Sequence, residues 1–325
     1  MSRGIIAVLT LLFTGCVAFN TIDIPIKAKP SRFQERVVQE EPAPQGKIAL
    51  IDIDGVISDD SEDSLFSSRD SLVVAVVEKL KMAEADANVK AVILRMNTPG
   101  GEVTASDILY SEVRAFQKRK PIPVVAVFMG VSASGGYYIA SACDRIVAHP
   151  TTITGSIGVV AMHVSLAGLL DKIGVKVEAL KSGEHKDMGS IFKDLGEEDR
   201  KLLQDLINSM YDRFVGVVVQ GRRGQLNEEQ VRKLADGRIY TADQALEAKL
   251  IDKIGYLKDA VEEAKSLAGM KSAVLVLYSR KPQQAENVYS VTQATSSFDP
   301  GNVEWARRIL GMRLFYIWEP YLLGK

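Results

Sequence analysis

Hydrophobic and polar positions along this chain follow two periods. Short apolar runs, typical of buried strands, each end at a polar or glycine-containing turn. Between them, apolar residues return every three or four positions, as in amphipathic helices. The expected strands are 48–54, 91–96, 123–129, 145–148, 157–161, 175–180 and 273–279. The expected helices are 71–85, 104–119, 134–142, 197–221, 227–235, 241–248 and 257–268.

The alternation of strand and helix predicts an α/β fold with right-handed crossovers. Residues 20–46 are polar and hold four prolines, so we expect a tether there and a folded body that begins at Lys47. Residues 305–323 are rich in Leu, Phe, Tyr and Trp. This segment is expected to pack on the core, and an amphipathic end facing a membrane or an assembly is the alternative.

Composition narrows the class of protein. The 325 residues are 46% hydrophobic and 25% charged, which is enough for a sizeable core. A formal net charge of −1 and the absence of a basic stripe argue against a nucleic-acid partner. Cys16 and Cys143 are too few for a disulfide framework, and Cys143 is expected to be a small buried core residue. We expect neither a metal nor a cofactor.

The N-terminus has the features of an export signal. Arg3 precedes an apolar run, 4–13, that is short for a membrane-spanning helix. Cys16 follows a small residue at the end of this run, as in a bacterial lipoprotein box, although Phe13 stands where leucine is more usual. On this interpretation Cys16 is lipidated. An uncleaved anchor and an ordinary signal peptide are the alternatives, and each places the body outside the cytoplasm.

A candidate nucleophile lies where the third long apolar run ends. Small residues around Ser134 permit a tight turn from strand to helix. The free N–H groups at the start of a helix favour a negatively charged oxygen there. The N–H of Gly135 would then point toward a developing oxyanion. The alternative is that Ser132 or Ser134 only caps the helix.

A second glycine turn, 97–101, follows the second long apolar run. Consecutive glycines let the backbone approach a substrate carbonyl closely and present an N–H group to it. We assign that donor to Gly101. A plain loop after a strand is the alternative.

With three histidines in the chain, a Ser-His-Asp triad has few candidates, so a lysine base is considered. Lys186 would have to lose its proton to act as that base, and the Ser156 hydroxyl could hold its amine. A solvated surface charge is the alternative for Lys186. His185 is the competing base, which in an extended stretch would face the opposite side. Two histidines are expected to be structural or exposed: His149 and His163.

Five motifs in this order resemble the short form of signal peptide peptidase A, a bacterial Ser-Lys protease of the Clp-protease/crotonase superfamily. The matching stretches are 97–101, 133–139, 154–159, 182–187 and 235–240. The resemblance implies stacked ββα units with C-terminal helices. It also implies roles for five residues: Ser134 as nucleophile, Lys186 as general base, Gly101 and Gly135 as oxyanion donors, and Ser156 as the hydroxyl that orients the lysine.

The chain is expected to consist of a signal peptide of lipoprotein type (1–15), a tether (16–46), a peptidase domain (47–271) that carries the resemblance, and a C-terminal extension (272–325). The resemblance implies an exported serine endopeptidase, attached to a membrane in the bacterial cell envelope by its N-terminal anchor or lipid. The expected substrates are remnant signal peptides and other extended apolar peptides, bound beside strand edges. A ring-like or dome-like homo-oligomer is implied, in which neighbouring domains or subunits supply the serine and the lysine of one site.

Two other functions stay open at this point. A crotonase-like acyl-transfer enzyme uses similar oxyanion geometry, but with acidic residues and a cytoplasmic coenzyme A thioester. An inactive peptide-binding scaffold would not need Ser134 or Lys186, and this chain has both. Two features depart from the resemblance: a lipoprotein signal replaces the usual membrane anchor, and the tail from Lys281 onward has no assignable motif.

Overall fold

The computed structural model describes residues 33–60, 62–64, 67–69, 71–279 and 314–318. The expected export signal, Cys16 and the first half of the expected tether lie outside these residues. So does most of the tail after 279. In the part of the chain that is described, no helix combines the length and the apolar character needed to cross a bilayer.

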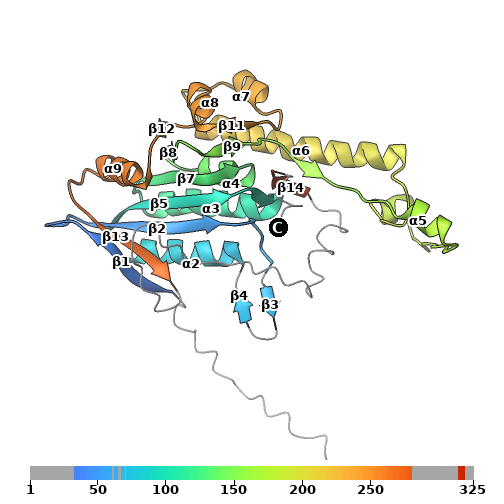
Figure 1. Ribbon diagram of the computed structural model, residues 1–325, viewed down its shortest axis with the longest axis horizontal. Helices are drawn as coiled ribbons and strands as arrows, with labels where there is room; N and C mark the ends of the chain where they lie inside the picture. The colour runs from blue at the N-terminus through green and yellow to red at the C-terminus, as the bar shows by residue number, and fades with distance from the viewer. Residues whose placement is uncertain (1–32, 61, 65–66, 70, 280–313, 319–325) are drawn as a thin grey trace, which may run out of the picture. The chain divides into compact units, whose positions relative to one another are not determined.

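A mixed sheet of nine strands forms the centre of the described residues (Figure 1). Its main path runs in the order β1 (Gln34–Glu40), β13 (Val274–Ser279), β2 (Lys47–Asp54), β5 (Val89–Thr98), β7 (Val124–Ala133), β8 (Arg145–Ala148) and β12 (Lys253–Ile254). Two further strands continue from β7: β9 (Ile153–Gly155) and β11 (Ile239–Thr241). From β13 to β12 every pair on the path is parallel. The α/β fold prediction is confirmed.

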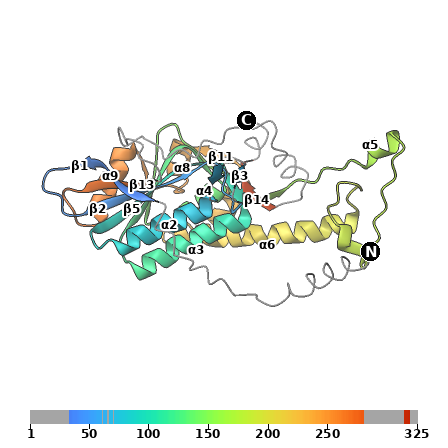
Figure 2. The same cartoon turned by 90° about the horizontal axis from the view of Figure 1, so that it is seen from below.

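Helices cover both faces of this sheet, because successive side chains of its strands point to opposite sides. In β2, Ile48 and Leu50 belong to the apolar cluster that includes helix α9 (Leu257–Leu267). Ala49 and Ile51 belong to the opposite cluster. That cluster includes α2 (Leu72–Ala85), α3 (Val103–Arg119) and α4 (Gly135–Ala140), of which Figure 2 shows α2 and α3 side by side. These strands are buried on both faces, which explains their continuous apolar runs.

The longest helix of the described residues, α6 (Glu197–Gly221), packs its C-terminal half into the core through residues such as Phe214 and Val218. Two short helices follow it, α7 (Glu228–Leu234) and α8 (Ala242–Glu247), and each begins with a capping box. The chain between the sheet and α6 contains α5 (Ala167–Lys172) and the 3₁₀ turn η1 (Glu184–Asp187). Neither of these two elements has a buried residue.

Two small sheets complete the described structure. One is the hairpin β3 (Glu62–Ser64) and β4 (Ser67–Arg69). The other has the order β10 (Val160–Ala161), β14 (Leu314–Ile317) and β6 (Gly100–Glu102), with both pairs antiparallel. Its middle strand comes from the C-terminal tail, so this tail packs on the body where the structure describes it, as expected.

Three expectations for local structure are wrong. Residues 34–40 form β1 instead of belonging to the tether, because this polar edge strand is held by backbone pairing to β13, which hydrophobic periodicity cannot reveal. Residues 175–180 form no strand, and Val175 and Val177 are exposed. The strand expected at 157–161 is replaced by two shorter ones, β9 before it and β10 at its end.

Cys143 has the predicted character. It is a buried free thiol within the main apolar cluster, and burial raises its pKa. A raised thiol pKa lowers the fraction of reactive thiolate, so Cys143 is an inert packing residue.

Candidate active site

The carboxyl ends of β5 and β7 meet at one edge of the sheet, as expected for a site in a parallel α/β fold. Thr98 of β5 lies opposite Ser132 of β7, so the turn after β5 lies beside Ser134. Two buried hydroxyls tie the ends of β5, β7 and β9 together. Ser132 Oγ donates to the Met96 carbonyl at 2.9 Å, and Thr154 Oγ1 donates to the Ser132 carbonyl at 2.6 Å.

Ser134 has a backbone conformation that serine rarely adopts, with φ 52° and ψ −113°. Its N–H donates to the Gly155 carbonyl at 2.7 Å, and its carbonyl accepts from Tyr138 N–H at 2.8 Å. The side chain is 1% exposed, yet Oγ has no hydrogen-bond partner in the described structure. Helix α4 therefore has no side-chain cap at Ser134, and the capping interpretation is wrong for this residue. A strained serine with an uncommitted hydroxyl is typical of a nucleophile turn.

The two predicted glycine turns come into direct contact. Gly100 has φ +101°, and a Cβ built on it would lie 2.0 Å from the Tyr316 carbonyl oxygen and 2.8 Å from Gly135 N. No side chain fits into this space. Gly100, for which no role was predicted, is therefore the residue that permits the close approach of the two turns.

The proposed oxyanion donors, Gly101 and Gly135, lie around one carbonyl oxygen. Strand β14 places Tyr316 opposite Gly101, and Trp318 N–H donates to the Pro99 carbonyl at 2.9 Å two residues along. In an antiparallel ladder, every second pair of opposite residues is hydrogen-bonded. Pro99 and Trp318 form one such pair, and Gly101 and Tyr316 form the next. The Gly101 N–H therefore faces the Tyr316 carbonyl. A Cβ on Gly135 would lie 3.1 Å from that same oxygen. As the first residue of α4, Gly135 has an N–H group that no helical carbonyl accepts.

The Tyr316 side chain fills an aromatic pocket between α4 and α6. Its ring stacks on Tyr138 at 5.0 Å between centroids and contacts Phe214 at 4.7 Å. Its hydroxyl donates to the Met210 carbonyl at 2.8 Å, and the residue is fully buried. This contact was not predicted from the sequence, although the aromatic richness of residues 305–323 is a signal for it.

Lys186 does not reach Ser134 within one chain. Its turn η1 is tied to the beginning of α6, where His185 Nδ1 lies 2.7 Å from Asp199 Oδ1. Ser134 lies near the other half of α6, because Tyr138 contacts Phe214 at 4.9 Å. At 1.5 Å per helical residue, Asp199 and Phe214 are about 22 Å apart. Figures 1 and 2 both show α5 and the start of α6 far from α4.

His185, the competing base, lies on the same turn as Lys186, and its hydrogen bond to Asp199 raises the pKa of His185. The segment is a 3₁₀ turn and is not extended, so the expected opposite orientation of His185 and Lys186 does not apply. The remaining histidines have structural contacts, as predicted. His149 lies 2.9 Å from Thr151 Oγ1, and His163 lies 3.1 Å from the Ser190 carbonyl.

Ser156 lines a cavity of about 600 Å³ beside the end of β14. It has φ 50° and is 8% exposed, and its N–H donates to the Arg238 carbonyl at 2.7 Å. Tyr211, Ile317 and Trp318 line the same cavity, whereas Lys186 does not. Of the predicted site residues, the structure therefore brings Ser134, Gly101 and Gly135 together. Ser156 is placed at an adjacent cavity, and Lys186 is left apart.

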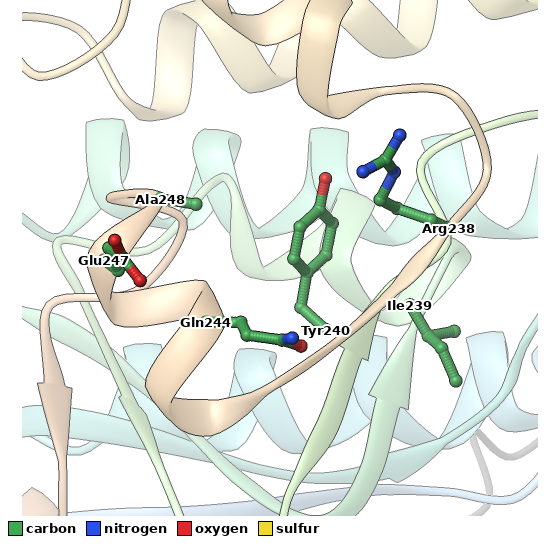
Figure 3. Close-up of a pocket in the computed structure, with 6 residues that line it drawn as sticks. All are labelled: Arg238, Ile239, Tyr240, Gln244, Glu247 and Ala248. Carbon is green, nitrogen blue, oxygen red and sulfur yellow. The ribbon is translucent and has the colours of Figure 1, made fainter.

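A second cavity, of about 370 Å³, lies between β11 and α8 (Figure 3). Its lining is Arg238, Ile239, Tyr240, Gln244, Glu247 and Ala248. None of the predicted catalytic residues is among them, so no chemistry is assigned to it. Within the described ranges, no group of three or more His, Cys, Asp or Glu side chains could hold a metal ion.

Comparison with known proteins gives consistent matches. Peptidase family S49 matches residues 116–271, and the Clp protease family matches residues 65–154. A protein described as signal peptide peptidase SppA in Enterococcus faecium is 40% identical over 239 residues, which cover 74% of this chain and 69% of that protein. Protease 4 of Haemophilus influenzae is 34% identical, over 82% of this chain and 42% of its own. The chloroplastic serine protease SPPA of Arabidopsis thaliana is 32% identical, over 75% of this chain and 36% of that protein.

Proposed function

Because this chain belongs to peptidase family S49 and is a serine-type endopeptidase, we propose that Ser134 is its nucleophile and that Lys186 of a neighbouring subunit is its general base. One observation carries the assignment of Ser134. Its buried hydroxyl has no partner, and the next residue, Gly135, lies with Gly101 close to the carbonyl oxygen of Tyr316. These are the parts that acyl transfer requires, apart from the base.

In the proposed reaction, the neutral Lys186 amine accepts the Ser134 hydroxyl proton as Oγ attacks the scissile carbonyl carbon. The N–H groups of Gly101 and Gly135 bind the resulting oxyanion. Collapse of the intermediate breaks the C–N bond, and Lys186 passes the proton to the departing amine. Water then loses a proton to Lys186, attacks the acyl ester and releases the acid, and the proton returns to Ser134 Oγ.

Three observations support a base from a neighbouring subunit. The turn that carries Lys186 is held at Asp199 at one end of α6. Ser134 lies near Phe214, about 22 Å along the same helix. The Lys186 side chain is exposed, and its amine has no hydrogen bond or ion pair in the described residues. The Ser156 cavity, open beside β14, offers a hydroxyl-lined space for an incoming lysine. A closed ring or dome of identical subunits would repeat such a contact at every interface.

The proposed substrates are extended apolar peptides, remnant signal peptides among them. Strand β14 provides the template, because it pairs with β6 on one side and β10 on the other. A peptide in its place would bind by strand addition through backbone hydrogen bonds. The residue in the position of Tyr316 would then precede the scissile bond, with its side chain in the pocket of Tyr138 and Phe214.

We also propose that the catalytic body faces the outside of the cytoplasm in a bacterial envelope. Membrane attachment through a lipid on Cys16, or through an uncleaved anchor, rests on the N-terminal sequence. Metabolic labelling with a fatty-acid analogue tests this directly. Label lost in Cys16→Ser would support lipidation, and an unlabelled wild-type chain would contradict it.

Mixing two inactive variants tests the shared site. Ser134→Ala subunits retain Lys186, and Lys186→Ala subunits retain Ser134. In randomly mixed oligomers, about one interface in four joins an intact serine to an intact lysine, so about a quarter of wild-type activity is expected. Cleavage of a fluorogenic apolar peptide after co-expression measures it. Activity that stays at the level of the separate variants would contradict a site built from two subunits.

Peptide substrates that differ only in the residue before the scissile bond test the pocket. Tyrosine is expected to exceed phenylalanine in kcat/KM by about three- to tenfold, because phenylalanine leaves the Met210 carbonyl without its hydrogen bond. The alanine peptide is expected to have a kcat/KM about tenfold to a hundredfold lower than the tyrosine peptide, since alanine leaves the aromatic pocket unfilled. Equal rates for the three peptides would show that this pocket does not select the substrate.

A further inference from the structure

The turn that carries Lys186 is held by charged side chains on both sides of that lysine. On one side, His185 Nδ1 lies 2.7 Å from Asp199 Oδ1. On the other, Asp187 accepts hydrogen bonds from Lys193 at 2.7 Å and from Lys181 at 2.8 Å. Lys193 also donates to Asp199 Oδ2 at 3.1 Å. These contacts form a closed chain from His185 through Asp199 and Lys193 to Asp187.

Lys186 stands between His185 and Asp187 but takes no part in this network. Its amine has no hydrogen bond or ion pair within the described residues, whereas Lys181 and Lys193 are both paired. The network therefore fixes the residues before and after Lys186 and leaves the lysine itself available.

Asp199 is the member of the network that connects it to the body of the protein. It lies in the first turn of α6 and is 7% exposed, and each of its carboxylate oxygens holds a different donor. The same helix is anchored in the core by Phe214 and Val218, both fully buried. A rigid helix thus extends from the core to the turn that carries Lys186.

We propose that Asp199 is a positioning residue for catalysis, holding η1 through His185 and Lys193 so that Lys186 is presented to the neighbouring subunit. This inference rests on the proposed function. A base must be held close to its productive geometry, since a displacement of about 1 Å costs on the order of a hundredfold in rate. Asp199 would act on the reaction only through the placement of Lys186.

The electrostatics of the turn agree with this geometry. The hydrogen bond to Asp199 raises the pKa of His185, and the carboxylates of Glu198 and Glu184 act in the same direction. Hydrogen bonds from Lys181 and Lys193 lower the pKa of Asp187 to about 2. The charged His185–Asp199 pair is complete below the ordinary histidine pKa of about 6.5, and its charge is lost as pH rises through the raised value. Neutral imidazole can still donate from Nδ1, so the contact persists as a weaker hydrogen bond.

The test is Asp199→Asn in the full chain, with Asp205→Asn as the matched control on the exposed surface of the same helix. For Asp199→Asn we expect kcat to fall about tenfold or more with KM within about twofold of wild type, because substrate binding lies at the other half of α6. Asp205→Asn is expected to retain wild-type values. His185→Asn, which keeps an N–H donor near the place of Nδ1, is expected to lose less kcat than His185→Ala.

A second readout reports directly on the contact between His185 and Asp199. Modification of His185 by diethyl pyrocarbonate, followed by peptide mass spectrometry over a pH range, reports its protonation. The midpoint is expected to fall in Asp199→Asn and to stay unchanged in Asp205→Asn. Melting temperature and oligomer size are measured in parallel, because Asp199 is itself buried and its contacts also support the fold. If Asp199→Asn alters the oligomer, the comparison of His185→Asn with His185→Ala decides the question.

Wild-type kcat in Asp199→Asn would overturn the proposal, and so would equal kcat in the two His185 variants. These results can be told apart from failure of the proposed function. A fully active Lys186→Ala would mean that Lys186 is not the base. An inactive Lys186→Ala together with a wild-type Asp199→Asn would refute the role of Asp199 alone.

Discussion

Ser134→Ala is expected to abolish peptide cleavage, lowering kcat by at least about a thousandfold. The substitution removes the hydroxyl oxygen that forms the acyl ester in the proposed mechanism. It should not disturb the fold, because Ser134 Oγ makes no hydrogen bond in the described structure. The strained backbone at φ 52° is equally unfavourable for alanine and for serine, so no new strain is introduced. Cleavage of a fluorogenic apolar peptide at a range of enzyme concentrations measures the loss.

Ser266→Ala, at an exposed position of α9, is the control and should be fully active. A serine-reactive phosphonate should label the wild type at Ser134 and should not label Ser134→Ala. Cleavage that survives in Ser134→Ala would contradict the assignment of the nucleophile. Labelling of Ser132 in its place would be inconsistent with the hydrogen bond that commits its hydroxyl to the Met96 carbonyl.

Lys186→Ala is expected to have an effect of the same order, because the Ser134 hydroxyl then has no group to accept its proton. Lys186→Arg should not restore activity, since a guanidinium stays protonated and cannot act as a base. Melting temperature should be unchanged in both variants, as the Lys186 side chain is exposed. The measurement is kcat/KM across a range of pH. Lys201→Ala, at an exposed position of α6, is the control.

His185 is the alternative candidate for the general base. If Lys186→Ala kept full activity and His185→Ala had none, the base would be His185. The contact between Nδ1 and Asp199 leaves the other ring nitrogen, Nε2, able to accept a proton, so the two variants decide between His185 and Lys186. A partial loss in His185→Ala, with Lys186→Ala inactive, would instead agree with a role in holding the turn.

Much of the sheet could be predicted from the sequence for a physical reason. Strands β2, β5 and β7 are buried on both faces, so each is a continuous apolar run that ends at a glycine turn. Strand β1 could not be predicted in this way. Its side chains are polar and largely exposed, and its position depends on backbone bonds to β13, more than two hundred residues away. Hydrophobic periodicity reflects the burial of side chains and gives no information on backbone pairing at the edge of a sheet.

The same distinction applies to the residues of the site. Ser134, Gly101 and Gly135 could be predicted because each lies where a buried strand ends, and parallel strands bring their ends together. The neighbours of Lys186 could not, since η1 owes its position to charged contacts that span several elements. Likewise, no spacing in the sequence indicates that Tyr316 lies against Gly101. The roles of Ser134 and Lys186 stay predictions until the variants are measured.

Strand β14 has a consequence for how binding constants of this peptidase should be interpreted. Under the proposed substrate mode, the edge of β6 is already paired to a segment of the same chain, and Tyr316 already fills the aromatic pocket. A tethered ligand competes at an effective concentration on the order of millimolar, whatever the concentration of enzyme. An apparent KM for a peptide would therefore combine its own affinity with the free energy of displacing this strand. A peptide with the sequence of residues 314–318 is the natural reference ligand against which that displacement can be calibrated.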